Sequence, residues 1–405
     1  MVLQGHIGVC LILVEEQLSM SNNSIARGVF ARAMIAAASV AVAASMLPQE
    51  AAGQQAAYQG IYVVSQRLKD DHSLLPSSIY STPYINGIMV SALWYQIEPS
   101  PGTYDWSLVD AEVNAAVASG KYISIGVTAG MYTPTWLYSA PYNVPYGNFM
   151  WGAHSGTRKH ACEPVTVPVP WDSNYLQAYG TMIQALSNHL QSIQGAYNLV
   201  TRVKLTGANT ATDELHLAYC SDTEGPQTWQ ALGYTPNLMY AAGQSLMQSV
   251  NTAFPDQLLD LNIIENGGLP PINNEGEIVS KKSKTYVNVE WNLITWALSS
   301  ASGFNTRFGV QWNAFNSNTA NDPPQMVLDA GRQGAVMGWQ TNDFGGIPVG
   351  TECNGGYANA VPCDDPGYQG ILDGAINVGG QFVEVWPVNV PEFPSAFEQA
   401  EGLFQ

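Results

Sequence analysis

The chain has 405 residues, of which 46% are hydrophobic and 11% are charged, and its formal net charge is −18. This composition is typical of a folded globular protein and disfavours extensive disorder. The acidic balance would repel phosphate backbones and anionic lipid surfaces, so we expect neither nucleic acid nor a membrane as a partner. Neutral glycans suit the chain better, because its 11 Trp and 20 Tyr offer aromatic faces for sugar rings.

Residues 1–53 have the pattern of a leader that carries a secretory signal peptide. Arg27 and Arg32 precede an apolar run over residues 33–44, and small residues follow near position 52. The run is short for a membrane span, so we expect cleavage and a secreted or periplasmic mature protein. Residues 1–19 fit no part of a signal, which indicates Met20 as the start of translation. An amphipathic N-terminal helix is the alternative.

The remaining chain, residues 54–405, predicts eight short strands rich in apolar, β-branched or aromatic residues. They span residues 60–64, 87–93, 122–127, 202–206, 258–264, 308–312, 335–339 and 382–386. Helical periodicity covers residues 106–119, 173–193, 237–253, 287–300, 323–331 and 394–404. Alternating strands and helices predict parallel pairing, and eight strands predict an α/β fold that is a single (β/α)8 TIM barrel. A doubly wound open sheet is the alternative, but no glycine-rich phosphate turn follows the first strand.

The segment after the second strand, residues 94–106, follows the pattern W-x-x-I-E-P-x-P-G-x-Y-D-W. It resembles the second-strand motif of clan A glycoside hydrolases, especially the family 42 and family 35 β-galactosidases. The resemblance implies that Trp94 and Glu98 help to shape a sugar site and are not catalytic. A Pro-Gly turn followed by a helix capped by Asp105 would account for the same residues.

The segment after the third strand, residues 130–137, follows the pattern G-x-x-x-P-x-W-L, which resembles a loop of the same enzymes. It makes Trp136 a candidate platform for a sugar ring. The alternative is an ordinary core tryptophan.

The loop after the fourth strand carries the first catalytic candidate, Glu214. Clan A enzymes place their general acid/base in this loop, and the resemblance implies that role for Glu214. A carboxylic acid among apolar neighbours has a raised pKa and can protonate a leaving oxygen. The spacing departs from the family pattern, because about seven residues separate Glu214 from the expected strand end and Asp213 replaces an asparagine. A carboxylate that only anchors backbone amides is the alternative.

A second carboxylate is needed for glycoside hydrolysis. Clan A places its nucleophile after the seventh strand, where this sequence has Gln340, which cannot serve as one. Glu384 alternates with apolar residues in the eighth strand and would point into the barrel, where an unused carboxylate is costly. Glu265 ends the fifth strand, and Asp343 follows Gln340 by three residues. We rank them in the order Glu384, Glu265, Asp343.

Aromatic and amide side chains gather at the predicted strand ends. The tryptophans are Trp94, Trp136, Trp312, Trp339 and Trp386, and the amides are Gln311 and Gln340. Together with Glu98 they form the expected substrate-binding set, although large barrels also fill their mouths with aromatics for packing alone.

Four cysteines follow the leader, namely Cys162, Cys220, Cys353 and Cys363. In an oxidising compartment they predict two disulfides, and three pairings are open. Proximity favours Cys353 with Cys363, which leaves Cys162 for Cys220. We expect no metal site and no cofactor, because no C-x-x-C or H-x-x-x-H spacing accompanies these residues.

The sequence therefore predicts a secreted glycoside hydrolase that acts on a neutral oligo- or polysaccharide through two carboxylates. A carbohydrate-binding barrel that has lost its nucleophile is the main alternative, which Gln340 would permit. A polysaccharide lyase is disfavoured, since no basic cluster is evident that could hold uronate groups.

Overall fold

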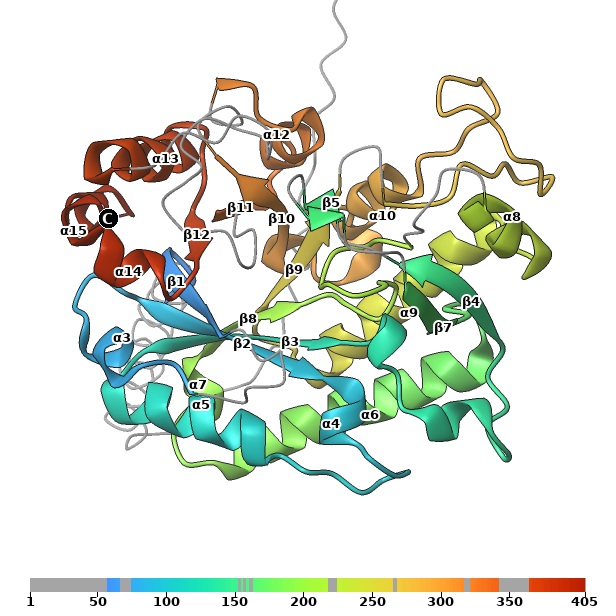
Figure 1. The fold of residues 1–405 in the computed structure, drawn as a ribbon, viewed down its shortest axis with the longest axis horizontal. Coiled ribbons are helices and arrows are strands. Elements are labelled where there is room, and N and C mark those ends of the chain that lie inside the picture. The colour runs from blue at the N-terminus through green and yellow to red at the C-terminus, as the bar shows by residue number, and fades with distance from the viewer. Residues whose placement is uncertain are drawn as a thin grey trace, which may run out of the picture. The chain divides into compact units, whose positions relative to one another are not determined.

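The computed structural model describes residues 57–65, 74–151, 154–155, 158–159, 163–217, 224–264, 268–316, 321–341 and 364–404. Its centre is a closed barrel of eight parallel strands (Figure 1). In chain order these are β1 (Gly60–Ser65), β2 (Gly87–Leu93), β3 (Tyr122–Thr128), β8 (Val200–Lys204), β9 (Leu258–Ile263), β10 (Phe308–Phe315), β11 (Val336–Thr341) and β12 (Phe382–Val385). Each predicted strand has a counterpart among them, so the predicted (β/α)8 barrel is confirmed and the open sheet is excluded.

Helices surround the barrel wall (Figure 1). They are α3 (Ser77–Ser81), α4 (Trp94–Ile97), α5 (Ser107–Ser119), α6 (Ser173–Ser192), α7 (Ala196–Leu199), α8 (Glu224–Ala231), α9 (Pro236–Ala253), α10 (Val289–Ala297), α12 (Gln325–Arg332), α13 (Asp365–Asn377), α14 (Asn389–Glu392) and α15 (Pro394–Glu401). The longest, α6, begins where the Asp172 carboxylate accepts hydrogen bonds from two backbone amides, and α5 ends at Gly120, which has a left-handed conformation.

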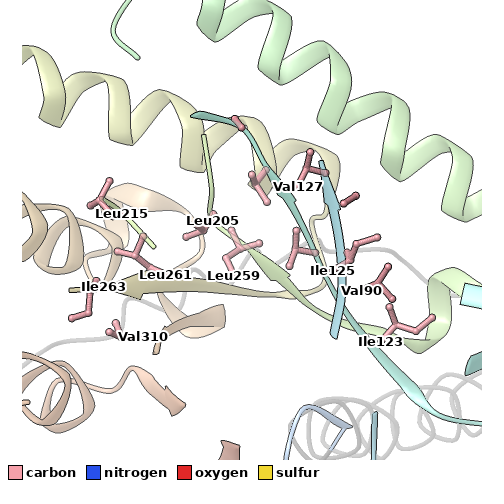
Figure 2. Close-up of a cluster of buried hydrophobic side chains, with 14 of the residues drawn as sticks. Val90, Ile123, Ile125, Val127, Leu205, Leu215, Leu259, Leu261, Ile263 and Val310 are labelled. Atoms are coloured by element: carbon pink, nitrogen blue, oxygen red, sulfur yellow. The ribbon is translucent and has the colours of Figure 1, made fainter. Parts of the chain in front are cut away.

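The main apolar core lies between the outer face of the strands and the helices. Figure 2 shows part of it, with Ile125, Leu259, Leu261 and Val310 all buried between wall and helices. Burial of nearly every strand residue explains why these strands read as continuous apolar runs in the sequence. A smaller apolar cluster fills part of the barrel interior and contains Tyr58, Tyr62, Leu258, Val336 and Phe382.

A hairpin and six of the helices, α3, α4, α7, α8, α13 and α14, were not expected from the sequence. An antiparallel hairpin of β4 (Tyr146–Trp151) and β7 (Glu163–Pro168) interrupts the segment between β3 and α6, and it encloses the short strands β5 (His154–Ser155) and β6 (Arg158–Lys159). Helix α13 contains Gly367, Gly370 and Gly374, which lower its intrinsic helix propensity and mask it in the sequence.

Residues 1–53 and Cys162, Cys220, Cys353 and Cys363 lie outside the described residues, so the signal peptide and the disulfides stay predictions. Over the ranges that are described, none of the helices has the length and apolar character needed to cross a bilayer. The same ranges contain no cluster of His, Cys, Asp and Glu suited to a metal ion.

Candidate active site

The five neighbouring strands β8, β9, β10, β11 and β12 point polar and charged side chains into the barrel. They are Arg202, Lys204, Asp260, Asn262, Gln311, Gln340 and Glu384, and each is buried. They alternate along their strands with apolar residues that face the helices, as the two-residue repeat of a strand requires. We call this set of side chains the ionic core. Its hydrogen bonds join β8, β10 and β11 to β12 through the interior of the barrel.

Glu384 lies at the centre of the ionic core. Its Oε1 accepts a hydrogen bond from Arg202 at 3.0 Å, and its Oε2 accepts one from Lys204 Nζ at 2.8 Å. Gln311 and Gln340 also donate to Oε2, at 2.8 and 2.9 Å. Burial alone would raise the pKa of Glu384, but the charges of Lys204 and Arg202 outweigh it and lower the pKa to about 2. Glu384 is therefore a permanently charged and fully partnered group.

The two cations of the ionic core are buried as completely as Glu384. Burial opposes the charge of Lys204, but the neighbouring carboxylates of Glu384, Asp213 and Asp260 outweigh it and raise its pKa. The Arg202 guanidinium stacks over the rings of Tyr62 and Phe382, 4.3 and 3.6 Å from their centroids. Aromatic faces and carboxylates offset part of the water that these cations have lost, while Nε and Nη1 of Arg202 are buried without a hydrogen-bond partner.

The loop after β8 explains the unusual spacing of Glu214. Leu205 N–H donates to Asp260 O, and the next ladder bond to β9, at Asn262 O, comes from Leu215 N–H. In a regular parallel ladder that second donor would be the residue two positions on, Gly207. The chain thus leaves the barrel wall at Thr206 and forms a loop, which we call the excursion. It then rejoins the wall, where Leu215 makes the hydrogen bond to β9 that Gly207 would make in an uninterrupted strand. Glu214 consequently stands at the end of β8, in the position that an uninterrupted strand would give to Thr206.

The excursion, residues 206–214, is fixed at both sides. Met131 N–H donates to Thr210 O at 2.7 Å, and Thr210 donates to His216 O at 3.0 Å. Gly130 lies so close to this loop that a Cβ there would come within 2.2 Å of the Thr210 carbonyl oxygen. Burial lowers the pKa of His216 to about 4, so this histidine is neutral near pH 7. Glu214 is therefore held by a packed and hydrogen-bonded loop.

Asp213 and Glu214 meet above the ionic core. Asn313 Nδ2 donates to Glu214 Oε1 at 2.8 Å and lies 3.3 Å from Asp213 Oδ1. Asp213 Oδ2 accepts from Asn262 at 2.7 Å and lies 3.3 Å from Lys204 Nζ. Burial raises the pKa of Asp213 to about 6, with a smaller contribution from Glu214, although Lys204 opposes the shift. The second carboxylate oxygen of Glu214, Oε2, is buried without a hydrogen-bond partner.

This arrangement can hold and deliver protons. One amide nitrogen orients two neighbouring carboxyl groups, and Asp213 can carry a proton in mildly acidic solution. Oε2 of Glu214 is a buried acceptor without a partner, as are both carboxylate oxygens of Asp260, but of the two residues Glu214 stands at the end of a strand and Asp260 in the middle of one.

The contacts of Glu384 favour a structural role over the catalytic role expected from the sequence. Its carboxylate has no exposed surface, and four side chains already occupy its two oxygens. Gln311 and Gln340, expected to bind substrate, instead donate to Glu384. The other two candidates, Glu265 and Asp343, lie outside the described residues.

Trp94 and Glu98 support the wall from within the core. Trp94 is fully buried, packs on Tyr175 and Tyr179, and donates its indole N–H to Glu98 Oε2 at 2.8 Å. Glu98 Oε1 accepts from Gly102 N–H at 3.0 Å, which fixes the Pro-Gly turn. Burial raises the pKa of Glu98. Both residues thus shape the rim indirectly and present no surface to a sugar.

The other expected platforms are also partly committed to packing. Trp339 is fully buried against Phe315, and Trp312 pairs with it in register on the same outer face of the wall. Trp136 and Trp386 are half-buried, and their indole N–H groups donate to Glu98 O at 3.1 Å and Thr341 O at 2.7 Å. Trp136 and Trp386 therefore stay candidates for sugar contact, whereas the geometry of Trp339 contradicts that role.

From the sequence, Asp213 was noted only as a departure from the family pattern, and no role was assigned to Asn313, Arg202 or Lys204. One signal was available, since Arg202 and Lys204 alternate with Val203 and Leu205 in an otherwise apolar strand. Charges at alternate positions of a buried parallel strand indicate a polar barrel interior.

No family model matches the sequence, and no curated protein matches it. Solved structures match in three dimensions. The catalytic domain of a β-amylase from Paenibacillus polymyxa has a TM-score of 0.52 and 11% identity, over 84% of this chain and 97% of that one. An endo-1,4-β-xylanase from Caldicellulosiruptor owensensis (TM-score 0.44, 10% identity, 82% and 86% covered) and xylanase 10B from Thermotoga petrophila RKU-1 (0.44, 12%, 82% and 82%) also match. Of the three, the β-amylase domain is similar enough to bear on the architecture, and it shows that the chain shares the barrel fold of that domain.

Proposed function

We propose that this protein is a glycoside hydrolase that acts on a neutral oligo- or polysaccharide, with Glu214 as the proton donor. The placement of Glu214 at the end of β8, beside Asp213 and oriented by Asn313, carries the proposal. In (β/α)8 enzymes, reacting groups lie at the carboxyl ends of the strands. The motifs at residues 94–106 and 130–137 resemble those of clan A hydrolases, and the domain that shares this fold is the catalytic domain of a β-amylase, which supports the reaction class.

The reaction would begin when the Glu214 carboxyl protonates the leaving glycosidic oxygen. A second carboxylate must then attack the anomeric carbon directly or activate a water molecule. Asp213 is one candidate for that group because it shares Asn313 with Glu214. Glu265, directly after β9, and Asp343, after β11, are the others. A separation of about 5 Å from Glu214 would give retention, and roughly 6.5–9.5 Å would give inversion.

The test is product release from malto-, xylo-, cello- and galacto-oligosaccharides, followed by chromatography for the wild type and Glu214→Gln. The variant keeps the side-chain volume and can still accept the Asn313 hydrogen bond, so its melting temperature should match the wild type while turnover is lost. Full turnover by Glu214→Gln would refute the assignment of the proton donor. Asp213→Asn, Glu265→Gln and Asp343→Asn, assayed alongside, identify the second group.

A non-catalytic carbohydrate-binding barrel is the second candidate. The observation in its favour is that Gln340 stands at the end of β11 and that Glu384 is bound by four side chains. It predicts that the wild type binds oligosaccharides and releases no product, even after prolonged incubation.

A further inference from the structure

The turns that follow β2 and β3 present a pair of tyrosines at the rim of the barrel. Tyr95 lies in α4 and Tyr132 in the 3-10 turn η1 (Gly130–Tyr132). Their rings are stacked, with centroids 6.3 Å apart and an interplanar angle of 26°. Tyr95 is 42% exposed, in contrast to the buried Trp94 beside it. This pair, in which Tyr95 is exposed and Tyr132 is half-buried, differs from the five strand-end tryptophans, each of which is buried or half-buried.

Both turns are rigidly anchored. In α4, Trp94 and Ile97 are buried and Trp94 is tied to Glu98, so Tyr95 and Gln96 are left on the outer side of the turn. In η1, Met131 N–H donates to Thr210 O in the excursion that carries Glu214. The strands are also in register, with Leu93 opposite Thr128, so the two turns begin at the same level of the wall. The turns that carry the two tyrosines are therefore anchored, and the turn of Tyr132 is joined to the Glu214 loop by the hydrogen bond of its neighbour Met131.

The chemistry of the two turns is uncharged. Neither α4 nor η1 contains an acidic or basic side chain, and the nearby Glu98 is buried with its oxygens bound to Trp94 and Gly102. Gln96 Nε2 lies 3.4 Å from the Tyr95 hydroxyl, so amide and phenol groups border the aromatic surface. An aromatic face with a border of uncharged donors and acceptors matches a neutral sugar ring, which has apolar C–H faces and equatorial hydroxyls.

We infer that Tyr95 and Tyr132 form a subsite that stacks against a neutral pyranose ring of the substrate, at the part of the barrel rim that follows β2 and β3. The inference rests on the proposed function, because it assigns the ligand as part of the same glycan. Rigid aromatic rings lose little conformational entropy on binding, so this subsite would contribute affinity and leave the chemical step unchanged.

The experiment measures binding by calorimetry in the full chain with Glu214→Gln, which prevents turnover. The probes are malto-, xylo-, cello- and galacto-oligosaccharides. Adding Tyr95→Ala or Tyr132→Ala should weaken binding of the preferred probe by several-fold to about tenfold, the range of one lost aromatic contact. Tyr95→Phe and Tyr132→Phe keep the ring and should retain most of the affinity. Leu403→Ala removes an equally exposed apolar side chain (49%) in the C-terminal turn and should change nothing.

In the wild-type background, the alanine variants should raise KM and leave kcat within about twofold, as loss of uniform binding does. Unchanged affinity in both alanine variants would overturn the subsite while leaving the hydrolase assignment intact. Absence of hydrolysis by the wild type, with binding that still depends on the tyrosines, would overturn the hydrolase and retain the subsite. Absence of binding to all four probes would overturn the subsite directly.

Discussion

Glu384 and Glu214 occupy the same barrel but have opposite environments. Glu384, in the middle of the wall, is fully buried, and both of its oxygens are bound by cations and amides. Glu214, at the end of β8, has one oxygen bound to Asn313 and one without a partner. A carboxylate at a strand end with one oxygen unpartnered is therefore a better candidate for chemistry than a fully buried one whose oxygens are both bound.

The comparison is tested most strongly at Glu214. Glu214→Gln should lower kcat roughly 10²–10⁴-fold, the usual contribution of a general acid, with little change in stability. Product release from the preferred oligosaccharide measures it. Glu275→Gln, an exposed glutamate distant in sequence, is the matched control and should retain wild-type turnover.

The structural side of the comparison is tested at Lys204. Lys204→Met leaves Glu384 and Asp213 without their shared cation and should lower the free energy of unfolding by roughly 3–5 kcal/mol, measured by urea titration. Arg332→Met breaks the exposed pair with Asp329, in which the arginine is 64% exposed, and should cost at most about 1 kcal/mol. Equal losses in the two variants would contradict a stabilising role for the ionic core.

The packing around the ionic core gives a smaller effect. A Cβ on Gly338 would come within 1.9 Å of the Phe382 ring, which stacks under Arg202. Gly338→Ala should therefore destabilise the protein by about 1–3 kcal/mol. Gly370 lies inside α13 with no atom near its Cβ position, and Gly370→Ala should be neutral or stabilise by up to about 1 kcal/mol. Thermal unfolding distinguishes the two outcomes by sign.

The dependence of stability on pH tests the charge states of the same core. Burial raises the pKa of Asp213 and of Asp260 to about 6, so between about pH 4 and pH 6 the folded state binds more protons than the unfolded state. Stability should fall as pH rises through this window, by at most about 1.4 kcal/mol per pH unit for each group. The lowered pKa of Glu384 acts oppositely, and its contribution is lost as pH falls toward about 2. Asp213→Asn should flatten the decline in urea titrations at several pH values; an unchanged slope would show that Asp213 does not titrate there.

The barrel architecture could be predicted from the sequence because strands of a buried parallel sheet consist of nearly continuous apolar residues. All eight strands were located, and helices α5, α6 and α9 were placed within one or two residues. Hairpin β4–β7 was missed because prolines at positions 164 and 168 argue against a strand. Helix α13 was missed because of its glycines.

The site was less predictable, since it depends on tertiary partners. The local pattern around Glu384 placed it inside the barrel, yet the residues that bind it come from other strands, up to 182 positions away. The tryptophans were located at strand ends. Whether a ring faces a sugar or the core depends on its position along the strand, because a shift of one residue moves a side chain to the other face of the wall. Trp339 lies on the face that packs against the core. Asp213 could not be assigned because its direction depends on how the excursion returns to the wall.

The interrupted ladder of β8 has a consequence for how this protein could be related to others. Because Leu205 and Leu215 are both bonded to β9, the number of residues between them can change without moving the carboxylate that precedes Leu215. Residues 206–211 are buried and joined to the turn after β3 by the Met131–Thr210 hydrogen bond, so a change in the length of this segment requires a matching change in that turn.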